Sequence, residues 1–233
     1  MSRRRDTATL PLPAVNNPAD TFAIERGLMA RGIRPVAGVD EAGRGPLAGP
    51  VVAACVILPP DCEYRIFRDS KITSEKERAL LFQILHENGA VFGLGLASAQ
   101  EIDRINILQA SLLAMKRAAL SCAEKNGALP ACLLVDGTFP MPLNVAQQTL
   151  VRGESRSAAI AAASILAKVH RDRLMAELHE KYPRYGWLQN KGYPTRAHRD
   201  AIARFGPCPE HRMSFRGVQD FVNNTSNRRD EKT

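Results

Sequence analysis

The chain has few of the features that mark secreted, zinc-binding or membrane-spanning proteins. Its five cysteines are an odd number, are scattered along 233 residues, and include no Cys-x-x-Cys pair. That pattern supports neither a disulfide framework nor a zinc site, and it favours a reducing compartment. The arginines near the N-terminus are followed by no apolar segment, so there is no secretory signal, and no apolar run approaches a membrane span. We therefore expect a cytoplasmic protein that does not bind membranes.

The charge of the chain is biased toward one sign. Lys and Arg number 32 against 24 Asp and Glu, which gives a net charge of +8. A basic balance favours a polyanionic partner, and nucleic acid before a membrane surface, because binding to phosphates releases counterions. The hydrophobic share of 45% is enough for a buried core. Composition predicts disordered ends, an N-terminal arm over 1–20 and a tail over 218–233.

Hydrophobic patterning predicts one α/β domain without internal repeats. Apolar or β-branched runs bounded by turn residues predict strands at 36–40, 50–58, 91–97, 131–135 and 145–151. Capping boxes formed by Ser74 with Glu77 and by Ser98 with Glu101 open two of the helices, which we expect over 22–31, 74–88, 98–127 and 157–182. A short glycine-rich loop separates the first two strands, which favours an antiparallel pair. A C-terminal helical extension is expected beyond the last long helix.

The most informative stretch is residues 36–45, VAGVDEAGRG. A short apolar run delivers two adjacent carboxylates, Asp40 and Glu41, and a glycine-flanked Arg44 follows at once. Carboxylate oxygens are the ligands that hard divalent cations prefer. Glycine lets the backbone approach a ligand closely, and arginine makes charge-assisted contacts with phosphate. The combination favours phosphoryl chemistry on a polyanion, although an acidic strand end that runs into a glycine turn would give the same acidic pair.

Asp136 offers a third carboxylate in an equivalent place. Like Asp40, it ends an apolar strand and precedes a glycine-containing turn. Ligands of open α/β sheets collect beyond the carboxyl ends of the strands, so the two carboxylates converge if their strands are parallel neighbours. Glu41 would face the other way in a regular strand, so we expect the strand to bend or end there. Three carboxylates so placed could hold one or two Mg²⁺ for phosphodiester hydrolysis, whereas Asp136-Gly137 alone would indicate an ordinary turn.

The segment GVDEAGRGPLAGPVVAA resembles the opening motif of the ribonuclease HII family, the type 2 ribonucleases H. Four further segments resemble that family in the same order: DSKITSEKER, LLVDG, SAAIAAASILAKVHRDRL, and NKGYPTRAHRDAI with GPCPEHRMSF. The resemblance implies a catalytic domain over 21–217 with a ribonuclease H-like fold, a mixed five-stranded sheet flanked by helices. It also implies a monomeric endonuclease that hydrolyses the RNA strand of RNA–DNA hybrids and cleaves at single ribonucleotides in duplex DNA. The implied products are a 3′-hydroxyl and a 5′-phosphate, the cofactor is Mg²⁺ or Mn²⁺, and the cellular role is removal of ribonucleotides from DNA.

Carried onto matching positions, the resemblance implies four catalytic carboxylates. Asp40, Glu41 and Asp136 match the metal-binding residues of the family. The family has an aspartate in a Lys-Gly-Asp-Ser-like segment before the alanine-rich helix, and this chain has RGES there, so Glu154 is the candidate for the fourth. Its side chain is one methylene longer, which puts the geometry of a second metal in doubt. Asp172 is a rival acid, which we interpret as a salt-bridged surface residue.

The resemblance also implies a set of substrate contacts: Gly43, Arg44, Gly45, Lys71, Lys168 and Tyr193. The backbone around Arg44 would sense the 2′-hydroxyl, the group that separates RNA from DNA. Tyr193 would pack on the sugar after the junction, and the two lysines would lie near phosphates. Ile72 stands where we expect a second lysine, which predicts one weaker backbone contact. His198 and His211 match the family pattern in structural or phosphate roles, because hydroxide made by a metal removes the need for a histidine base.

Two other classes of protein are open on the residues alone. A dinucleotide-binding enzyme is suggested by the Gly43-x-Gly45-x-x-x-Gly49 pattern after a strand. Against it, Asp40 and Glu41 would repel a pyrophosphate, and the next segment is a β-branched run rather than a helix. A non-catalytic nucleic-acid binder is suggested by the charge, but converging carboxylates would weaken its affinity for phosphate. The type 3 ribonucleases H carry an extra N-terminal domain, for which the 35 residues before Val36 are too few.

Overall fold

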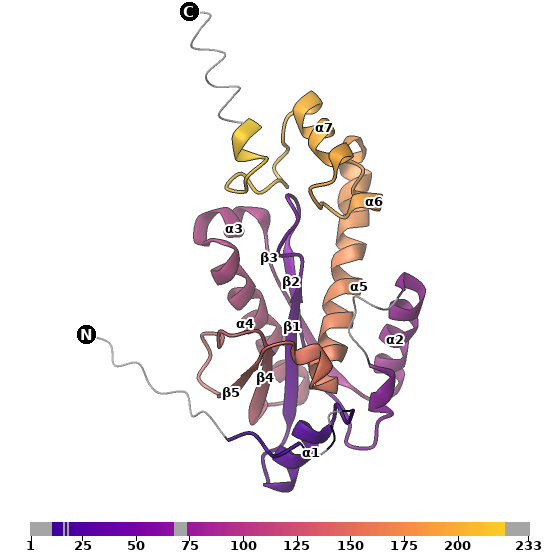
Figure 1. Ribbon diagram of the computed structural model, residues 1–233, viewed down its shortest axis with the longest axis vertical. Coiled ribbons are helices and arrows are strands. Elements are labelled where there is room, and N and C mark those ends of the chain that lie inside the picture. Colours follow the sequence, from indigo (N-terminus) through magenta and orange to yellow (C-terminus); the bar gives the residue numbers. More distant parts are fainter. Residues whose placement is uncertain (1–10, 16, 18, 68–73, 222–233) are drawn as a thin grey trace, which may run out of the picture. The chain divides into compact units, whose positions relative to one another are not determined.

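The computed structural model describes residues 11–15, 17, 19–67 and 74–221 (Figure 1). The chain divides into two compact units, each described by itself: unit 1 is Met1–Ala42, Val52–Leu96 and Leu112–Val169, and unit 2 is Gly43–Val51, Ala97–Ser111 and His170–Thr233. The strands are β1 Val36–Ala42, β2 Val51–Ile57, β3 Val91–Ala97, β4 Cys132–Asp136 and β5 Ala146–Leu150. The α-helices are α1 Ala23–Ala30, α2 Glu75–Glu87, α3 Ala99–Ile105, α4 Ile107–Asn126, α5 Ala158–Lys181, α6 Trp187–Asn190 and α7 Arg196–Phe205.

The five strands form one mixed sheet in the order β3-β2-β1-β4-β5 (Figure 1). β1 pairs with β2 in antiparallel orientation, which confirms the expectation from the glycine-rich loop. β1 and β4 are parallel neighbours, and so are β4 and β5. The mixed five-stranded sheet that the resemblance implies is therefore present, with β1 at its centre.

The parts of α4 and α5 that belong to unit 1 pack directly on the sheet because the strands carry glycine at the points of contact. A Cβ atom on Gly38 of β1 would lie 2.1 Å from the carbonyl carbon of Ala159, in the first turn of α5. A Cβ atom on Gly93 of β3 would lie 2.1 Å from the backbone nitrogen of Cys122, in α4. Contacts this short leave no room for any other residue. The first turn of α5 is thus seated on β1, two residues before Asp40.

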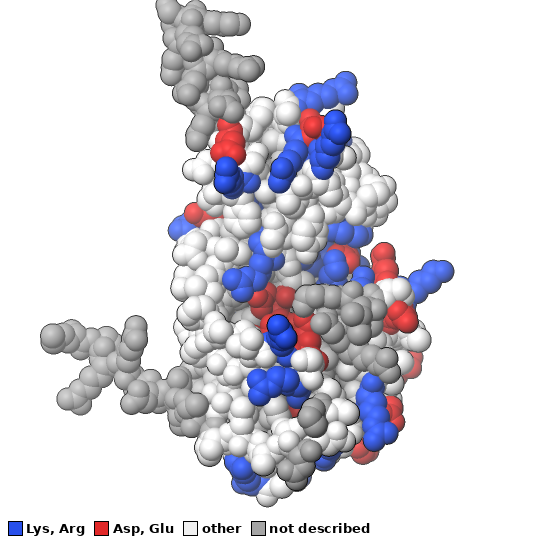
Figure 2. Space-filling model, viewed as in Figure 1, with Lys and Arg blue, Asp and Glu red and all other residues white. Residues whose placement is uncertain are grey.

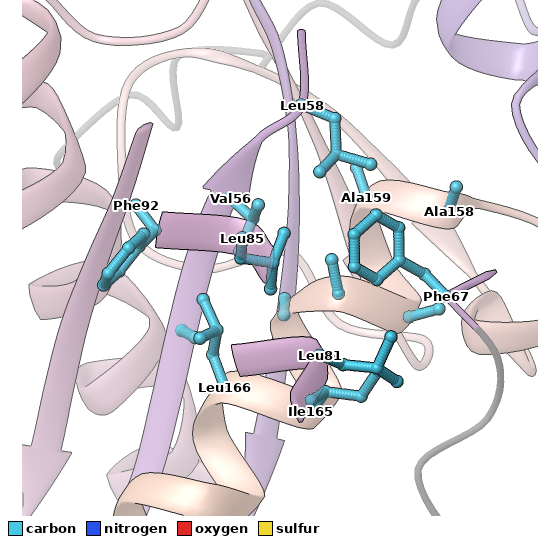
Figure 3. Packing of buried hydrophobic residues seen from close by; sticks show 14 of the residues in the cluster. Val56, Leu58, Phe67, Leu81, Leu85, Phe92, Ala158, Ala159, Ile165 and Leu166 are labelled. Atoms are coloured by element: carbon cyan, nitrogen blue, oxygen red, sulfur yellow. The ribbon is translucent and has the colours of Figure 1, made fainter. Parts of the chain in front are cut away.

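The largest apolar cluster lies between α5 and the sheet (Figure 3). The alanine-rich first half of α5 brings the helix backbone close, and larger side chains from β2, α2 and β3 fill the space around it. These larger side chains include Val56, Leu81, Leu85 and Phe92, and α5 itself adds Ile165 and Leu166. Burial of their apolar surface stabilises the fold by roughly 25 cal/mol for each Å² removed from water. The sheet that carries Asp40 therefore lies against a packed core.

The single helix expected over 98–127 is two helices, so that prediction was wrong in this respect. Asn106 separates α3 from α4 and has a left-handed φ of 67°, which asparagine tolerates better than most residues. Its side-chain oxygen accepts a hydrogen bond from the backbone N–H of Gln109 at 3.1 Å and so caps α4. The apolar pattern continues across this break, which is why the sequence indicated one helix.

The packed chain extends beyond both ends of the domain expected over 21–217. Val218, which we assigned to the tail, is fully buried with Leu47 and Ile202 in unit 2, and Phe221 packs against this cluster. Leu12, which we assigned to the arm, packs against an apolar cluster in unit 1. No helix in the described part of the chain is long and apolar enough to cross a membrane.

A buried carboxylate lies beneath the start of α5. Glu25 of α1 is 1% exposed, and its Oε1 accepts hydrogen bonds from the Ser157 hydroxyl at 2.6 Å and the Ala159 N–H at 3.1 Å. Ser157 in turn accepts from the N–H of Ile160, so both side chains satisfy donors in the first turn of the helix. Burial raises the pKa of Glu25 from its ordinary 4.5 to about 7.

We expect Glu25 to make the stability of the fold fall as pH rises. The native state holds the proton of Glu25 more tightly than the unfolded chain, so its stabilising effect is full below pH 4.5 and is lost as pH rises past about 7. The shift corresponds to roughly 3 kcal/mol of unfolding free energy. Urea unfolding of the wild type and of Glu25→Gln across this range measures it. Parallel pH profiles for the two proteins would contradict it.

Candidate active site

Two carboxylates meet where β1 and β4 reach the same edge of the sheet. The parallel register pairs Val36 with Cys132 and continues to Val39 with Val135, and the next residues are Asp40 and Asp136. In parallel neighbours, residues in register point to the same face. The convergence expected from the sequence is therefore found in the structure.

Hydrogen bonds hold these carboxylates in place. Asp40 is 3% exposed, and its Oδ1 accepts from the backbone N–H of Glu41 at 2.7 Å. Asp136 Oδ1 accepts from the N–H of Gly153 at 2.6 Å. Gly153 opens a short 3₁₀ helix, Gly153–Ser155, which contains the buried Glu154. The bond therefore ties Asp136 to the segment that carries the fourth candidate carboxylate.

The carboxylates of unit 1 repel one another. The pKa of Asp40 is raised well above its ordinary range, first by burial and then by the negative charges of Glu41, Asp136 and Glu154. Buried like charges are costly unless a cation offsets them. Oxygen donors that carry several negative charges suit Mg²⁺ and Mn²⁺. The donor chemistry of these residues therefore fits a hard divalent cation.

The arrangement of Glu41 differs from what we expected. β1 keeps its register with β2 from Gly38 opposite Val56 through Ala42 opposite Val52, so strand pairing continues past Glu41 to the end of β1. Successive side chains of a regular strand alternate in direction, so Glu41 would have to turn toward a cation held by Asp40 and Asp136. Within 11–15, 17, 19–67 and 74–221, no three Asp, Glu, His or Cys residues form a set that could hold a metal ion as they stand. The expectation of a break in the strand was wrong because pairing with β2 continues past the last pair with β4.

The remaining charged candidates of the sequence lie in different places. Asp172 is 8% exposed, so its interpretation as a surface residue was wrong. It belongs to unit 2, whereas the other four candidate carboxylates belong to unit 1. Lys168 lies on α5 in unit 1 and is partly exposed. Lys71 and Ile72 lie outside the described residues.

In unit 2, a buried arginine holds the glycine-rich loop by its carbonyl groups. The guanidinium of Arg212, which is fully buried, donates from Nη2 to the oxygens of Gly43 at 2.6 Å and Gly49 at 2.9 Å. Its Nη1 donates to the oxygen of Arg44 at 2.9 Å, and its Nε donates to that of Gly49 at 3.0 Å. Arg212 thereby fixes the path of the backbone around Arg44.

Arg171 of α5 supports the same loop. It is 1% exposed and donates to the oxygens of Ala48 at 3.2 Å and Pro50 at 3.1 Å. Gly43 has a φ of +97°, and a Cβ atom there would lie 2.0 Å from Arg171 Nε, so both conformation and space demand glycine. Sequence reasoning missed Arg171 and Arg212. An arginine in a charged segment is usually exposed, and a single sequence does not distinguish a buried arginine from an exposed one.

Tyr193 lies beside the same loop of unit 2. A Cβ atom on Gly45 would lie 3.8 Å from its ring, and the Arg171 guanidinium lies 6.0 Å from the ring centroid. The ring is 43% exposed, while Arg44 and Gly45 are also exposed. The structure therefore brings together the loop and the tyrosine that the resemblance singled out.

The two histidines of the family pattern are buried. His198 is 0% and His211 1% exposed. Burial lowers the pKa of both, and the neighbouring His198 contributes to lowering that of His211 to about 4. Neutral, buried imidazoles suit a structural role, which is one of the two roles expected from the sequence.

A group of acidic side chains lies near the middle of the face shown in Figure 2, with separate Lys and Arg side chains around it. A local concentration of one sign of charge in a chain of net charge +8 attracts counter-ions to that place.

The sheet order, the helices on the sheet and the carboxylates at its edge define a protein with a ribonuclease H-like fold. Solved structures support this class: ribonuclease H2 from Pyrococcus horikoshii matches with a TM-score of 0.64 and 24% identity, over 82% of this chain and 98% of that one. Bst-RNase HIII in complex with Mn²⁺ matches with a TM-score of 0.69 and 16% identity, over 86% of this chain and 74% of that one.

The family follows from sequence comparison. The model of the ribonuclease HII family matches residues 37–218. Ribonuclease HII of Desulfotalea psychrophila is 56% identical over 205 residues, which cover 88% of this chain and 91% of the relative. The chain belongs to the ribonuclease HII family and is a ribonuclease H, an enzyme that hydrolyses the RNA strand of RNA–DNA hybrids.

Proposed function

We propose that the enzyme binds two divalent cations, Mg²⁺ or Mn²⁺, through Asp40, Glu41 and Asp136, with Glu154 as the fourth catalytic carboxylate. The observation that carries this proposal is the position of the buried Asp40, whose pKa is raised first by burial and then by the charges of Glu41, Asp136 and Glu154. Divalent cations offset the repulsion between these charges when they bind. The Mn²⁺ complex of Bst-RNase HIII is consistent with such a site on this fold.

The chemistry proposed is hydrolysis of a phosphodiester bond that leaves a 3′-hydroxyl and a 5′-phosphate. Divalent cations bound here would supply an activated water and stabilise the charge on the leaving oxygen. Asp40 and Asp136 would hold them, and each has one carboxylate oxygen fixed by a backbone N–H. Glu154 adds charge from a longer side chain, which gives it a wider reach than an aspartate.

We further propose that the enzyme cleaves at single ribonucleotides embedded in duplex DNA, and that it removes them from DNA in the cell. The exposed backbone of Gly43-Arg44-Gly45 would recognise the 2′-hydroxyl, and Tyr193 would pack on the sugar after the junction. In support, Arg212 fixes the loop and Tyr193 lies against Gly45. Lys168 and Lys71 would contact backbone phosphates.

A comparison of three duplexes tests this function. We expect cleavage of a duplex with one ribonucleotide and of an RNA–DNA hybrid, no cleavage of an all-DNA duplex, and no activity in the presence of chelator. Product ends identified by ligation and phosphatase treatment should be a 3′-hydroxyl and a 5′-phosphate. Binding of all three duplexes without cleavage at any Mg²⁺ or Mn²⁺ concentration would favour a non-catalytic binder instead.

Replacement of Tyr193 by alanine is expected to damage junction cleavage more than nucleic-acid affinity. Loss of the ring removes packing on one sugar, for which a fall of about tenfold to a hundredfold in kcat is expected from the energy of such contacts. Tyr193→Phe keeps the ring and serves as the control. Steady-state kinetics on the single-ribonucleotide duplex and a binding titration measure the two effects. Equal losses of cleavage and binding would show that Tyr193 has only a binding role.

A further inference from the structure

Four aromatic rings of unit 2 form a buried cluster that contacts the main chain of the exposed Tyr193. Tyr185 stacks on Trp187 with their centroids 5.1 Å apart, and it meets His211 edge-on at 4.6 Å. His198 lies 5.3 Å from His211 and 6.1 Å from Trp187. All four are at most 3% exposed. Buried polar atoms in such a cluster need defined partners, which fixes where their protons lie.

The hydrogen bonds determine the tautomer of each histidine. Trp187 Nε1–H can only donate, and it lies 3.0 Å from His198 Nε2, so that nitrogen carries no proton. The backbone N–H of Cys208 donates to His211 Nδ1 at 3.0 Å, so His211 carries its proton on Nε2. This proton points to His198 Nε2 at 3.2 Å, which therefore accepts from two donors. A neutral His198 must then carry its proton on Nδ1.

The proton on His198 Nδ1 points to the main chain of Tyr193. Nδ1 lies 3.0 Å from the Tyr193 oxygen, which also accepts from the N–H of Thr195 at 2.8 Å. The N–H of Tyr193 donates to the oxygen of Asn190 at 2.8 Å. Both backbone groups of this exposed residue therefore have hydrogen-bond partners, and one of the partners is the buried His198.

We propose that His198 is a positioning residue for Tyr193: its Nδ1–H holds the Tyr193 main-chain oxygen and so fixes where the ring stands. The inference rests on the proposed substrate role of Tyr193. Trp187 and His211 act indirectly. Their N–H groups donate to His198 Nε2, so the proton of a neutral His198 must lie on Nδ1. A small displacement of a group that positions substrate can cost much of the rate.

Two substitutions separate the two nitrogens of His198. The amide of asparagine reaches the place of Nδ1, so His198→Asn keeps a donor to Tyr193 and loses the acceptor for Trp187. Glutamine reaches the place of Nε2, so His198→Gln does the reverse. We expect His198→Gln to lower kcat on the single-ribonucleotide duplex by about tenfold with little change in KM, and His198→Asn to stay within about threefold of the wild type.

A double-mutant cycle tests whether the effect runs through Tyr193. In a Tyr193→Ala background, His198→Gln should cause no further loss of kcat, because the ring it positions is absent. Tyr185→Phe is the matched control: it removes the bond from the Tyr185 hydroxyl to the Gly206 oxygen in the same cluster, and it should lower thermal stability without changing junction cleavage. The same loss from His198→Gln in both backgrounds would overturn the proposal.

Nitrogen-15 NMR of histidine-labelled enzyme tests the tautomers independently of activity. We expect His198 protonated on Nδ1 and His211 on Nε2. If His198 is protonated on Nε2 and Tyr193→Ala still impairs junction cleavage, the positioning role of His198 is overturned while the role of Tyr193 stands. A Tyr193→Ala variant with full junction cleavage would instead overturn the proposed role of Tyr193, and the positioning with it, whatever the tautomers.

Discussion

Asp136→Asn is expected to leave the fold intact and to reduce cleavage of an RNA–DNA hybrid by roughly a thousandfold or more. Asparagine keeps the volume of the side chain and an oxygen that can accept from the N–H of Gly153, which lies 2.6 Å from Asp136 Oδ1. What it removes is one unit of negative charge at the place where we propose that divalent cations bind. The substitution therefore keeps the hydrogen bond of Asp136 and removes only its negative charge.

The measurement is single-turnover cleavage of a labelled hybrid at saturating Mg²⁺, beside circular dichroism to confirm the fold. Asp200→Asn is the matched control, because it is the same substitution at a side chain that is 72% exposed. It should cleave at the wild-type rate. An Asp136→Asn enzyme that keeps more than about a tenth of the wild-type rate would show that Asp136 is not a metal ligand.

Asp40→Asn is expected to abolish cleavage and, without metal, to make the fold more stable. The pKa of Asp40 is raised by burial and by three neighbouring carboxylates, so its ionised form destabilises the native state near neutral pH. Asparagine removes that repulsion at nearly constant volume. Each kcal/mol recovered should raise Tm by about 2–4 °C for a chain of this size. Stability given up for activity is common at catalytic sites.

Thermal unfolding in chelator and in Mg²⁺ measures both parts of this expectation. In chelator, Asp40→Asn should unfold at a higher temperature than the wild type. Addition of Mg²⁺ should raise the Tm of the wild type, because a ligand that binds only the native state stabilises it, and should raise that of the variant much less. An unchanged or lower Tm of the variant in chelator, together with equal responses to Mg²⁺, would contradict a shared cation site.

Elements with strong local signals could be predicted from the sequence. The apolar runs before Asp40 and Asp136 gave two strands that proved to be parallel neighbours. Both capping boxes are present, with Ser74 and Ser98 each accepting from a backbone N–H three residues on. These features depend on residues close together in the chain, so a single sequence contains all the information that they need.

Features that depend on tertiary partners could not be predicted. The sequence places Arg212 more than 160 residues from Gly43, whose oxygen it binds, and nothing local to either residue indicates the other. The same holds for Glu25, which caps a helix that begins more than 130 residues later. The course of β1 past Asp40 was missed for a related reason, since pairing of Glu41 with Ala53 on β2 outweighs the glycine signal that follows.

Anomalous scattering from crystals grown with Mn²⁺ tests most directly whether the carboxylates of β1 and β4 share divalent cations. One or two peaks within coordination distance of the carboxylate oxygens of Asp40 and Asp136, with Glu41 or Glu154 turned toward them, are the predicted result. Peaks only at other places on the protein, or none at millimolar Mn²⁺, would contradict the proposed site.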